Sequence, residues 1–264
     1  MMKKLVLLVL VLFCGLLLGR ETPYFEGRYD DFDRLSQVSL QNRQSGEFTF
    51  TRLIFSGRIP GYYKNWYTDY PTGDENLVRI LRRTTDLNIS EEPRAIPIHH
   101  ADLFNYPMVY AIEAGQMVLD ESDGAVLREY LIRGGFWMID DFWGTVEWAN
   151  FEREMKKVFP DLDIVDIPIT HQIFHTLYDI DEVMQVPSIA YKYYEKNPIT
   201  WEQDGFQAHA RGIFADDGRL MVFINFNTDL MDASEWADDP KYPNNFSVYS
   251  IRMFTNAIIY SMTH

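Results

Sequence analysis

Short apolar runs alternate with amphipathic segments through the first half of the chain, and this order restricts the fold more than any other feature. The apolar runs predict strands at residues 48–55, 96–98, 107–112 and 136–139. Segments with helical spacing predict helices from residue 72 or 74 to about 86, from 122 to 133 and from 145 to about 159. Alternating strands and helices form βαβ units, so we expect an α/β fold with a mostly parallel sheet and helices on both faces.

The second half of the chain is less regular. Residues 163–167 favour a strand, 171–177 a short helical turn and 178–206 an irregular excursion. Two apolar runs flank Asp217-Gly218, and an Asp-Gly pair in that position is a strong hairpin signal. The hairpin strands are expected at residues 207–214 and 219–226, and a final helix that packs on the sheet at residues 247–262.

The N-terminal segment has the pattern of a signal peptide. Lys3 and Lys4 precede an uncharged apolar run that is too short for an ordinary membrane span. We expect a signal peptide at residues 1–19, an extended arm at residues 20–46 and a single α/β domain at residues 47–264. The protein is then exported to the periplasm or cell envelope, and an uncleaved signal would be its membrane anchor.

Charge and cysteine content narrow the classes of function. The formal net charge is −15, from 39 acidic and 24 basic residues, whereas nucleic-acid binding needs clustered basic side chains. We therefore expect no nucleic-acid partner, but a polar small molecule or an envelope protein. Cys14 is the sole cysteine and lies in the expected signal peptide. A processed chain would have no thiolate for a metal, a disulfide or nucleophilic catalysis.

Two adjacent carboxylates, Asp140 and Asp141, directly follow the predicted strand at residues 136–139. The carboxyl end of such a strand is where ligands bind in open α/β sheets. A carboxylate there can ligate a divalent cation, act as a general base or accept sugar hydroxyls. Because side chains alternate along a strand, one of the two is expected to face a cleft. The other interpretation is that they accept hydrogen bonds from loop amides.

The loop before the first helix combines aromatic and polar side chains. Trp and Tyr rings with nearby acids and amides suit a carbohydrate or another polar ligand. The other interpretation is a loop held by buried aromatic rings, in which Asp74 only caps the helix. The candidate ligand-binding residues of the whole chain are Trp66, Asp69, Tyr70, Asp74, Asn76, His100, Asp140, Asp141 and Trp143.

Other catalytic and cofactor motifs are weak or missing in the sequence. His171 and His175 have a metal-ligand spacing, but the Glu of the His-Glu-x-x-His motif is lacking, so we favour a turn fixed by polar residues. The sequence contains no Gly-x-Ser-x-Gly elbow and no phosphate loop. We therefore assign no catalytic residue, metal or cofactor.

Five motifs occur in a fixed order along the chain. They are Phe48 to Phe55, Trp66-x-x-Asp69-Tyr70-Pro71-x-x-Asp74-x-Asn76-Leu77, Asp102-Leu103-Phe104-x-Tyr106-Pro107, Gly134-Gly135-Phe136 through Asp140-Asp141, and His171-x-Ile173-Phe174-His175-x-x-Tyr178-Asp179. Together they resemble the bacterial domain-of-unknown-function 4159 (DUF4159) family over about residues 47–264. Gln172 stands where members of that family commonly have proline.

This resemblance implies a flavodoxin-like sheet, related to class I glutamine amidotransferase-like and trehalose-utilisation (ThuA-like) domains. It implies no particular activity. Amidotransferases of this kind use a cysteine at the turn after the strand, and Asp140-Asp141 stands there in this chain. Amidotransferase chemistry is therefore not expected.

The sequence thus favours a non-catalytic, exported module that binds a ligand or partner at a cleft between residues 140–143 and 66–74. The alternative is a hydrolase of a sugar-like polar substrate that uses Asp140 or Asp141 as base, with or without a divalent metal. That mechanism needs Asp69 or Asp74 to face them across the cleft. A structural subunit of an envelope complex is a third interpretation.

Overall fold

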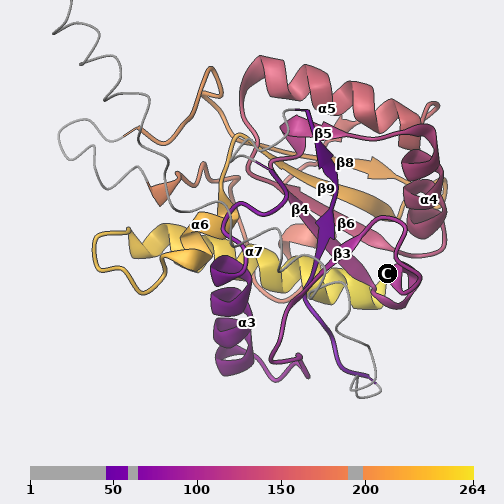
Figure 1. Ribbon diagram of the computed structural model, residues 1–264. Coiled ribbons are helices and arrows are strands. Elements are labelled where there is room, and N and C mark those ends of the chain that lie inside the picture. The colour runs from indigo at the N-terminus through magenta and orange to yellow at the C-terminus, as the bar shows by residue number, and fades with distance from the viewer. Residues whose placement is uncertain (1–45, 59–64, 190–198) are drawn as a thin grey trace, which may run out of the picture. The chain divides into compact units, whose positions relative to one another are not determined.

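A mostly parallel sheet of seven strands forms the centre of the structure (Figure 1). The structure is a computed structural model that describes residues 46–58, 65–189 and 199–264, all of which belong to one compact unit. The expected signal peptide at residues 1–19 and the arm up to residue 45 lie outside the described residues. No helix within the described ranges has the length and apolar character needed to cross a membrane.

The strand order across the sheet is β3-β1-β4-β6-β9-β8-β7. The first five strands of this order run parallel to one another, and β8 is antiparallel to both β9 and β7. Their bounds are β1 Thr51–Ile54, β3 Arg94–Pro97, β4 Met108–Ile112, β6 Phe136–Asp140, β7 Val165–Asp166, β8 His209–Phe214 and β9 Leu220–Phe226. The expected parallel sheet and the C-terminal hairpin are confirmed.

A separate two-stranded antiparallel ribbon pairs β2 (Ser56–Gly57) with β5 (Met117–Val118). Short 3₁₀ turns lie at η2 (Leu103–Asn105), η3 (Ala114–Gln116) and η4 (Gln172–Phe174). The ribbon and η3 continue the chain beyond the carboxyl ends of β1 and β4. They therefore stand at the same edge of the sheet as the candidate ligand site.

Helices cover both faces of the sheet, as expected (Figure 1). On one face lie α4 (Glu121–Ile132) and α5 (Gly144–Val158), which pack against each other. On the other face lie α3 (Thr72–Thr84), α6 (Leu230–Glu235) and α7 (Asn244–Thr263). Every residue of β4, β6 and β9 is buried, which explains why these strands have mostly apolar sequences rather than alternating ones.

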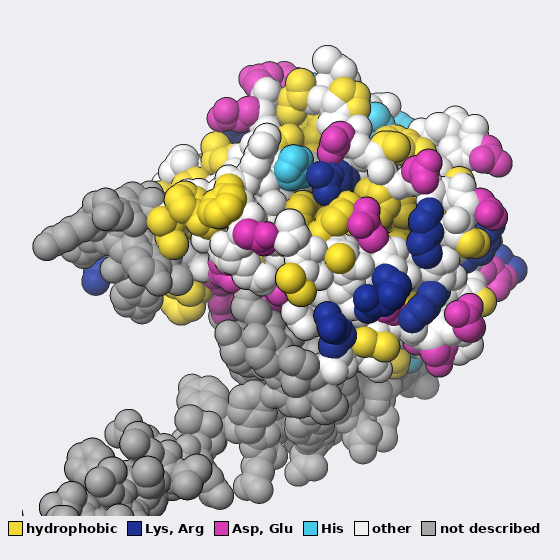
Figure 2. Space-filling model, turned by 90° about the horizontal axis from the view of Figure 1, so that it is seen from above, with side chains coloured by type: hydrophobic (Ala, Val, Ile, Leu, Met, Phe, Trp, Pro, Cys, Tyr) yellow, Lys and Arg dark blue, Asp and Glu magenta, His cyan; other side chains and the backbone are white. Residues whose placement is uncertain are grey.

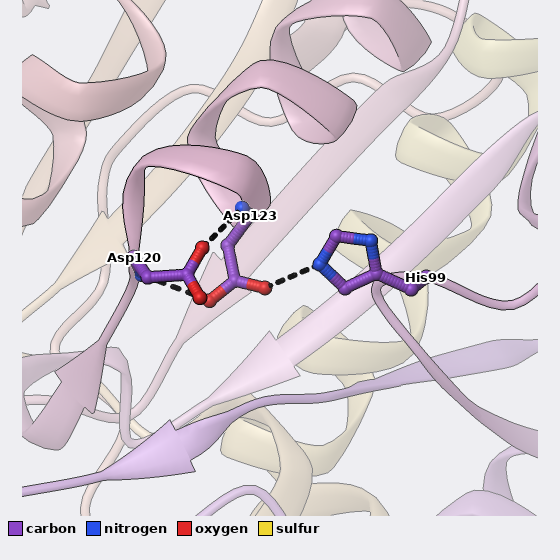
Figure 3. Close-up of side chains that lie close together, drawn as sticks. All are labelled: His99, Asp120 and Asp123. Carbon is purple, nitrogen blue, oxygen red and sulfur yellow. Dashed lines mark hydrogen bonds and ion pairs between the residues drawn. The ribbon is translucent and has the colours of Figure 1, made fainter.

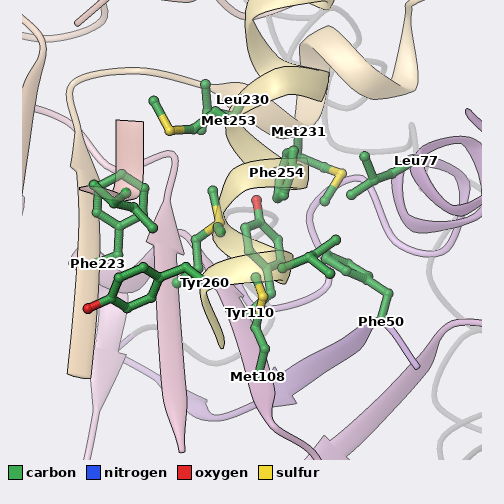
Figure 4. Packing of buried hydrophobic residues seen from close by; sticks show 14 of the residues in the cluster. Phe50, Leu77, Met108, Tyr110, Phe223, Leu230, Met231, Met253, Phe254 and Tyr260 are labelled. Atoms are coloured by element: carbon green, nitrogen blue, oxygen red, sulfur yellow. The ribbon is translucent and has the colours of Figure 1, made fainter. Parts of the chain in front are cut away.

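The largest part of the core lies between the sheet and α7 (Figure 4). Phe254 of α7 contacts the rings of Phe50 and Tyr110 edge-on, with centroids 6.0 and 5.5 Å apart. Leu77 of α3 and Met231 of α6 belong to the same cluster. Burial of each side chain of this size stabilises the fold by about 1.5–3 kcal/mol, so α7 is fixed firmly on the sheet.

The helix starts differ from the expected caps. Neither Thr72 nor Asp74 caps α3, because Pro71 occupies the cap position and supplies no side-chain hydrogen bond. In α4 the cap is Asp120, which forms a reciprocal capping box with Asp123. Thr145 lies inside α5 rather than at its cap position, Trp143.

Asp204, which is distant in the sequence, accepts hydrogen bonds from the first turn of α5. The Asp204 carboxylate accepts hydrogen bonds from the Thr145 backbone N–H, at 2.8 Å, and from the Thr145 hydroxyl, at 2.7 Å. The Glu147 carboxylate accepts a further bond from the backbone N–H of Trp143, at 2.7 Å. Helix α5, which follows the Asp140-Asp141 turn, is therefore fixed at its beginning by long-range as well as local contacts.

Candidate functional site

Three loops meet at the carboxyl edge of the parallel strands: residues 65–71 before α3, the turn after β6 and the turn after β9. Backbone hydrogen bonds join the last two, from Asp141 N to Thr228 O and from Asn227 N to Phe142 O, both at 3.1 Å. Glu113 N, at the end of β4, donates to the backbone oxygens of Asp140 and Asp141. The turns after neighbouring strands thus hold one another in place.

Five carboxylates gather where these loops meet, and we call Asp69, Asp141, Asp229, Asp232 and Glu235 the acidic cluster. One oxygen each of Asp69, Asp141 and Asp229 lie within 4.8 Å of one another. One oxygen each of Asp69, Asp232 and Glu235 meet the same limit. Asp69 belongs to both groups and is the centre of the cluster.

Unusual backbone conformations place two of these acids. Asp69 and Asp141 have positive φ angles of 62° and 49°, in the left-handed region that Asp tolerates better than most residues. The left-handed turn at Asp141 ends the side-chain alternation of β6 and brings its carboxylate close to Asp69 and Asp229. Asp141 therefore reaches the cluster although it adjoins a regular strand.

Asp140 has a different environment from Asp141. Its Oδ2 atom accepts hydrogen bonds from Leu230 N (2.8 Å), Met231 N (3.1 Å) and the Tyr110 hydroxyl (3.1 Å). It thereby attaches the first turn of α6 to the end of β6, as the loop-amide interpretation supposes. The side chain is fully buried, and its Oδ1 atom has no hydrogen-bond partner within the described part of the chain.

The electrostatics of the acidic cluster favour protonation when no cation is bound. Burial raises the pKa of Asp69 well above its ordinary value, and the charges of Asp232, Asp141 and Glu235 raise it further. Burial likewise raises the pKa of Asp229, with Asp141 and Asp232 adding to the effect. Burial raises the pKa of Glu235 to about 7, again with a contribution from Asp232. Like charges at these separations resist simultaneous ionisation.

Arg52 supports the candidate site and is one of the residues that sequence reasoning missed. It lies in β1 with its side chain fully buried, and its Nε and Nη2 atoms donate to the two oxygens of Asp74 at 3.1 and 2.5 Å. Its Nη1 atom donates to the backbone oxygens of Trp66 and Thr68 at 2.9 and 2.6 Å. A charged residue inside an otherwise uncharged strand is the sequence signal that could have revealed it.

These contacts correct the expectation for Asp74. The side chain is fully buried and paired with Arg52, so it neither caps α3 nor presents its carboxylate to a ligand. Instead, the Arg52–Asp74 pair connects β1, α3 and residues 65–71. That connection holds Asp69 in the acidic cluster.

The two tryptophans do not form an exposed aromatic rim. Trp143 is fully buried, and its indole Nε1 donates to Asp141 Oδ1 at 2.7 Å. Trp66 is 5% exposed and packs on the half-buried ring of Tyr70, with centroids 5.7 Å apart. Trp66 thus matches the interpretation of a loop held by buried rings, while Trp143 orients Asp141.

The remaining two candidates, Asn76 and His100, lie outside the acidic cluster. Asn76 Nδ2 donates to the backbone oxygen of Glu235 at 2.8 Å and so ties α3 to α6. His100 follows the edge strand β3, and its Nδ1 accepts a hydrogen bond from Asp102 N at 3.2 Å. Asn76 supports the cluster indirectly, and His100 belongs to a separate turn.

The histidine pair of the fifth motif fixes a turn, as we expected from its weak metal signature. His171 precedes η4, and its Nδ1 accepts a hydrogen bond from Ile173 N at 3.1 Å. His175 contacts the backbone oxygen of Ile169 with Nε2 at 2.8 Å and Asp179 with Nδ1 at 2.9 Å. Each histidine thus has a local structural contact.

A second group of potential metal ligands comprises His99, Asp120 and Asp123 (Figure 3). The two aspartates are already engaged in the capping box of α4, and His99 Nε2 lies 2.9 Å from Asp123 Oδ1. The His99 side chain is 53% exposed. Helix capping accounts for this arrangement, so the group indicates no further ligand site.

Basic side chains gather on the α5 side of the molecule, which Figure 2 views directly. Near the end of α5, Lys157 and Arg153 contact Glu154 at 2.7 and 3.2 Å, and Lys156 lies 3.8 Å from Asp163. These basic groups are therefore compensated by neighbouring acids. Near the acidic cluster, the buried Arg52 is the described cation that lowers the pKa of both Asp69 and Glu235.

Three members of the acidic cluster were not predicted. Asp229, Asp232 and Glu235 lie at the start of α6 or within it, and α6 was not expected at all. The rule that pointed to Asp140 and Asp141 also applies to the polar residues after β9, since β9 is parallel to β6. Carboxylates that converge in this way are the ligands preferred by hard cations such as Ca²⁺ and Mg²⁺.

Comparison with known proteins identifies the family. A search of curated proteins finds no match to the chain. A family model with the description "Domain of unknown function (DUF4159)" matches residues 49–262, which includes all three loops of the acidic cluster. The chain therefore belongs to the DUF4159 family.

Proposed function

We propose that this protein is an exported, non-catalytic α/β module of the cell envelope that binds a positively charged polar ligand at the acidic cluster. The ligand is either a free molecule or a cationic group presented by an envelope protein. The observation that carries this proposal is the position of Asp69, whose carboxylate approaches those of Asp141, Asp229, Asp232 and Glu235. Export rests on the sequence of residues 1–19.

The reason for a cationic ligand is electrostatic. Buried carboxylates repel one another and either take up protons or require a positive partner. Arg52 lowers the pKa of Asp69 and of Glu235, but burial and the neighbouring acids outweigh it. The guanidinium nitrogens of Arg52 are, moreover, already bonded to Asp74 and to two carbonyl groups. A bound cation would offset the negative charge that these acids bring together.

We also propose the flavodoxin-like arrangement that the resemblance implies. Numbered by their order in the chain, the five parallel strands β3-β1-β4-β6-β9 follow the order 2-1-3-4-5, which is that of flavodoxin-like folds. Ligands of such folds bind beyond the carboxyl ends of the strands, where the acidic cluster lies. The relation to ThuA-like domains rests on the resemblance of the sequence motifs.

The hydrolase alternative is favoured by one observation. Asp69 and Asp141 carry oxygens no more than 4.8 Å apart, so the pair belongs to the closely spaced type, at about 5 Å, that retaining glycosidases use. A buried acid of raised pKa beside a second carboxylate suits general acid catalysis. Asp140 Oδ2, by contrast, accepts hydrogen bonds from the first turn of α6, so Asp141 is the better candidate for a base.

A thermal-shift screen of the full chain tests the proposal. The screen contains divalent metals, organic cations such as polyamines, and neutral sugars, and is applied to wild type, Asp69→Asn and Asp141→Asn. The matched control is Asp163→Asn, whose side chain is 91% exposed. We expect a cationic compound to raise Tm in wild type and the control, but not in the two cluster variants.

Two results would change this conclusion. If no cationic compound raises Tm, or if the increase is equal in all four proteins, the acidic cluster is not the binding site. If a sugar alone stabilises the protein and is hydrolysed by wild type but not by Asp141→Asn, the hydrolase alternative is correct.

A further inference from the structure

We infer that the acidic cluster is a divalent-cation site, with Asp69, Asp141 and Asp229 as its ligands and Ca²⁺ as the best-fitting ion. This inference deepens the proposed function and rests on it, because it specifies the positively charged ligand. Two sets of three acids share Asp69, and the inference concerns the set that contains Asp141 and Asp229.

The separations within this group fit a single ion. Ca²⁺ binds oxygens at about 2.3–2.6 Å, so two ligands on opposite sides of one ion lie up to about 5 Å apart. The three ligand oxygens are all within 4.8 Å of one another, which places them inside this range. The Mg²⁺–oxygen distance of about 2.1 Å allows a span of only about 4.2 Å. Three oxygens at equal separations can share one ion up to about 4.5 Å apart for Ca²⁺ and about 3.6 Å for Mg²⁺, so Ca²⁺ fits more of the permitted range.

A separate observation indicates a missing partner. Asp69 Oδ2 is a buried atom that receives no hydrogen bond from the described residues. Asp140 precedes Asp141 in the sequence and is fully buried, and its Oδ1 atom likewise receives no hydrogen bond from the described residues. Buried carboxylate oxygens without a donor are unfavourable unless a proton or a cation satisfies them. Asp69 is itself one of the three ligands, so the lack of a donor to its Oδ2 atom among the described residues points to a bound cation.

Hydrogen bonds orient the other two ligands. Trp143 Nε1 donates to Asp141 Oδ1 at 2.7 Å, and Asp232 N donates to Asp229 Oδ1 at 2.9 Å. Contacts of this kind fix the direction of ligating carboxylates in metal sites. Asp141 and Asp229 are thus held in place before an ion arrives.

The second group, Asp69 with Asp232 and Glu235, is the weaker candidate. Asp232 Oδ2 accepts a hydrogen bond from Ile189 N at 2.5 Å, and its Oδ1 accepts one from Trp236 Nε1 at 3.2 Å. Both oxygens of Asp232 are therefore committed to protein donors. For this reason we assign the cation to the group that contains Asp141 and Asp229.

Metal titrations of the full chain test the assignment after dialysis against EDTA. Binding of Ca²⁺, Mg²⁺ and Mn²⁺ is measured by calorimetry, and Tb³⁺ serves as a luminescent substitute for Ca²⁺. Because Trp143 contacts a ligand directly, excitation of tryptophan should sensitise Tb³⁺ emission. The variants are Asp69→Asn and Asp141→Asn, and the control is Asp120→Asn, in the separate group of His99, Asp120 and Asp123.

We expect saturable Ca²⁺ binding in wild type and in Asp120→Asn, and at least a tenfold loss of affinity in Asp69→Asn. In EDTA, Asp69→Asn should be at least as stable as wild type, because the substitution removes one of several repelling acids. A merely structural role for Asp69 would instead lower the stability in EDTA. Asp141→Asn repeats the affinity measurement should Asp69→Asn fail to fold.

The outcomes separate this inference from the proposed function. If the metals do not bind but an organic cation stabilises wild type and not Asp69→Asn, the cation assignment is wrong and the proposed function stands. If neither metals nor organic cations bind, both are wrong. Metal binding of unchanged affinity in both cluster variants would also overturn the assignment.

Discussion

Removal of the Arg52 side chain should reveal how strongly the candidate site depends on one buried ion pair. In Arg52→Met, the Asp74 carboxylate remains buried without its partner, and the backbone oxygens of Trp66 and Thr68 lose their donor. Loss of one partner from a buried pair destabilises a protein by about 3–5 kcal/mol. We therefore expect Arg52→Met to lower the free energy of unfolding by about 4 kcal/mol, a large part of the usual 5–15 kcal/mol.

The double variant Arg52→Met/Asp74→Leu separates the ion pair from the loop contacts. It leaves no buried charge at this position, so the remaining loss is that of the two hydrogen bonds from Arg52 to carbonyl groups, at about 1–3 kcal/mol in total. The single variants Arg52→Met and Asp74→Leu should each be less stable than the double variant. The coupling energy between the two positions should then be at least about 2 kcal/mol.

Urea unfolding at fixed pH, followed by tryptophan fluorescence and far-ultraviolet circular dichroism, measures these free energies. The matched control is Arg79→Met, since the Arg79 side chain is 48% exposed and lies 3.6 Å from Asp238. A surface pair of this kind contributes about 0–1 kcal/mol. If the two single losses simply add in the double variant, or if Arg52→Met resembles Arg79→Met, the buried pair does not hold the loop as we argue.

Two further predictions concern the acidic cluster and the helix contact behind it. Burial, together with the charge of Asp232, raises the pKa of Glu235 to about 7. Between about pH 4.5 and 7 the unfolded chain has lost this proton, whereas the folded chain retains it. The free energy of unfolding in EDTA should therefore fall as pH rises through this range, by about 1–2 kcal/mol when the partial exposure of Glu235 is allowed for. Glu235→Gln should flatten this profile, and an unchanged profile in the variant would contradict the assignment. Gly124→Ala should lower the free energy of unfolding by about 1–3 kcal/mol, although alanine favours helices more than glycine does. The reason is that the added methyl group would lie 2.5 Å from the backbone oxygen of Lys157 in α5. A higher Tm in this variant would show that α4 can move away from α5.

Much of the fold follows from local patterns in the sequence. The runs at residues 107–112 and 136–139 are apolar throughout because both faces of β4 and β6 are covered, and the Asp-Gly hairpin signal placed β8 and β9 correctly. Helix α6 could not be predicted in this way, since Leu230–Glu235 is too short to show a periodic apolar face. Strand order likewise depends on contacts between distant segments.

The candidate site was only partly predictable for the same reason. Asp69 and Asp141 were among the expected residues, and the structure brings them together. Asp74 was misinterpreted because an acid near a helix start resembles a cap, whereas its partner Arg52 lies 22 residues earlier in the chain. Trp143 was expected at a rim, but burial of its ring turns the indole N–H towards Asp141.

The attachment of each acidic loop to a different buried element has a consequence for affinity. Arg52 fixes residues 65–71 to β1, and Asp140 fixes the beginning of α6 to β6. The carboxylates cannot separate to relieve their repulsion, so the energy of bringing them together is supplied when the chain folds. A ligand then meets a preorganised site and loses little free energy to ordering the protein. Tight binding would therefore be accompanied by an unliganded protein of reduced stability.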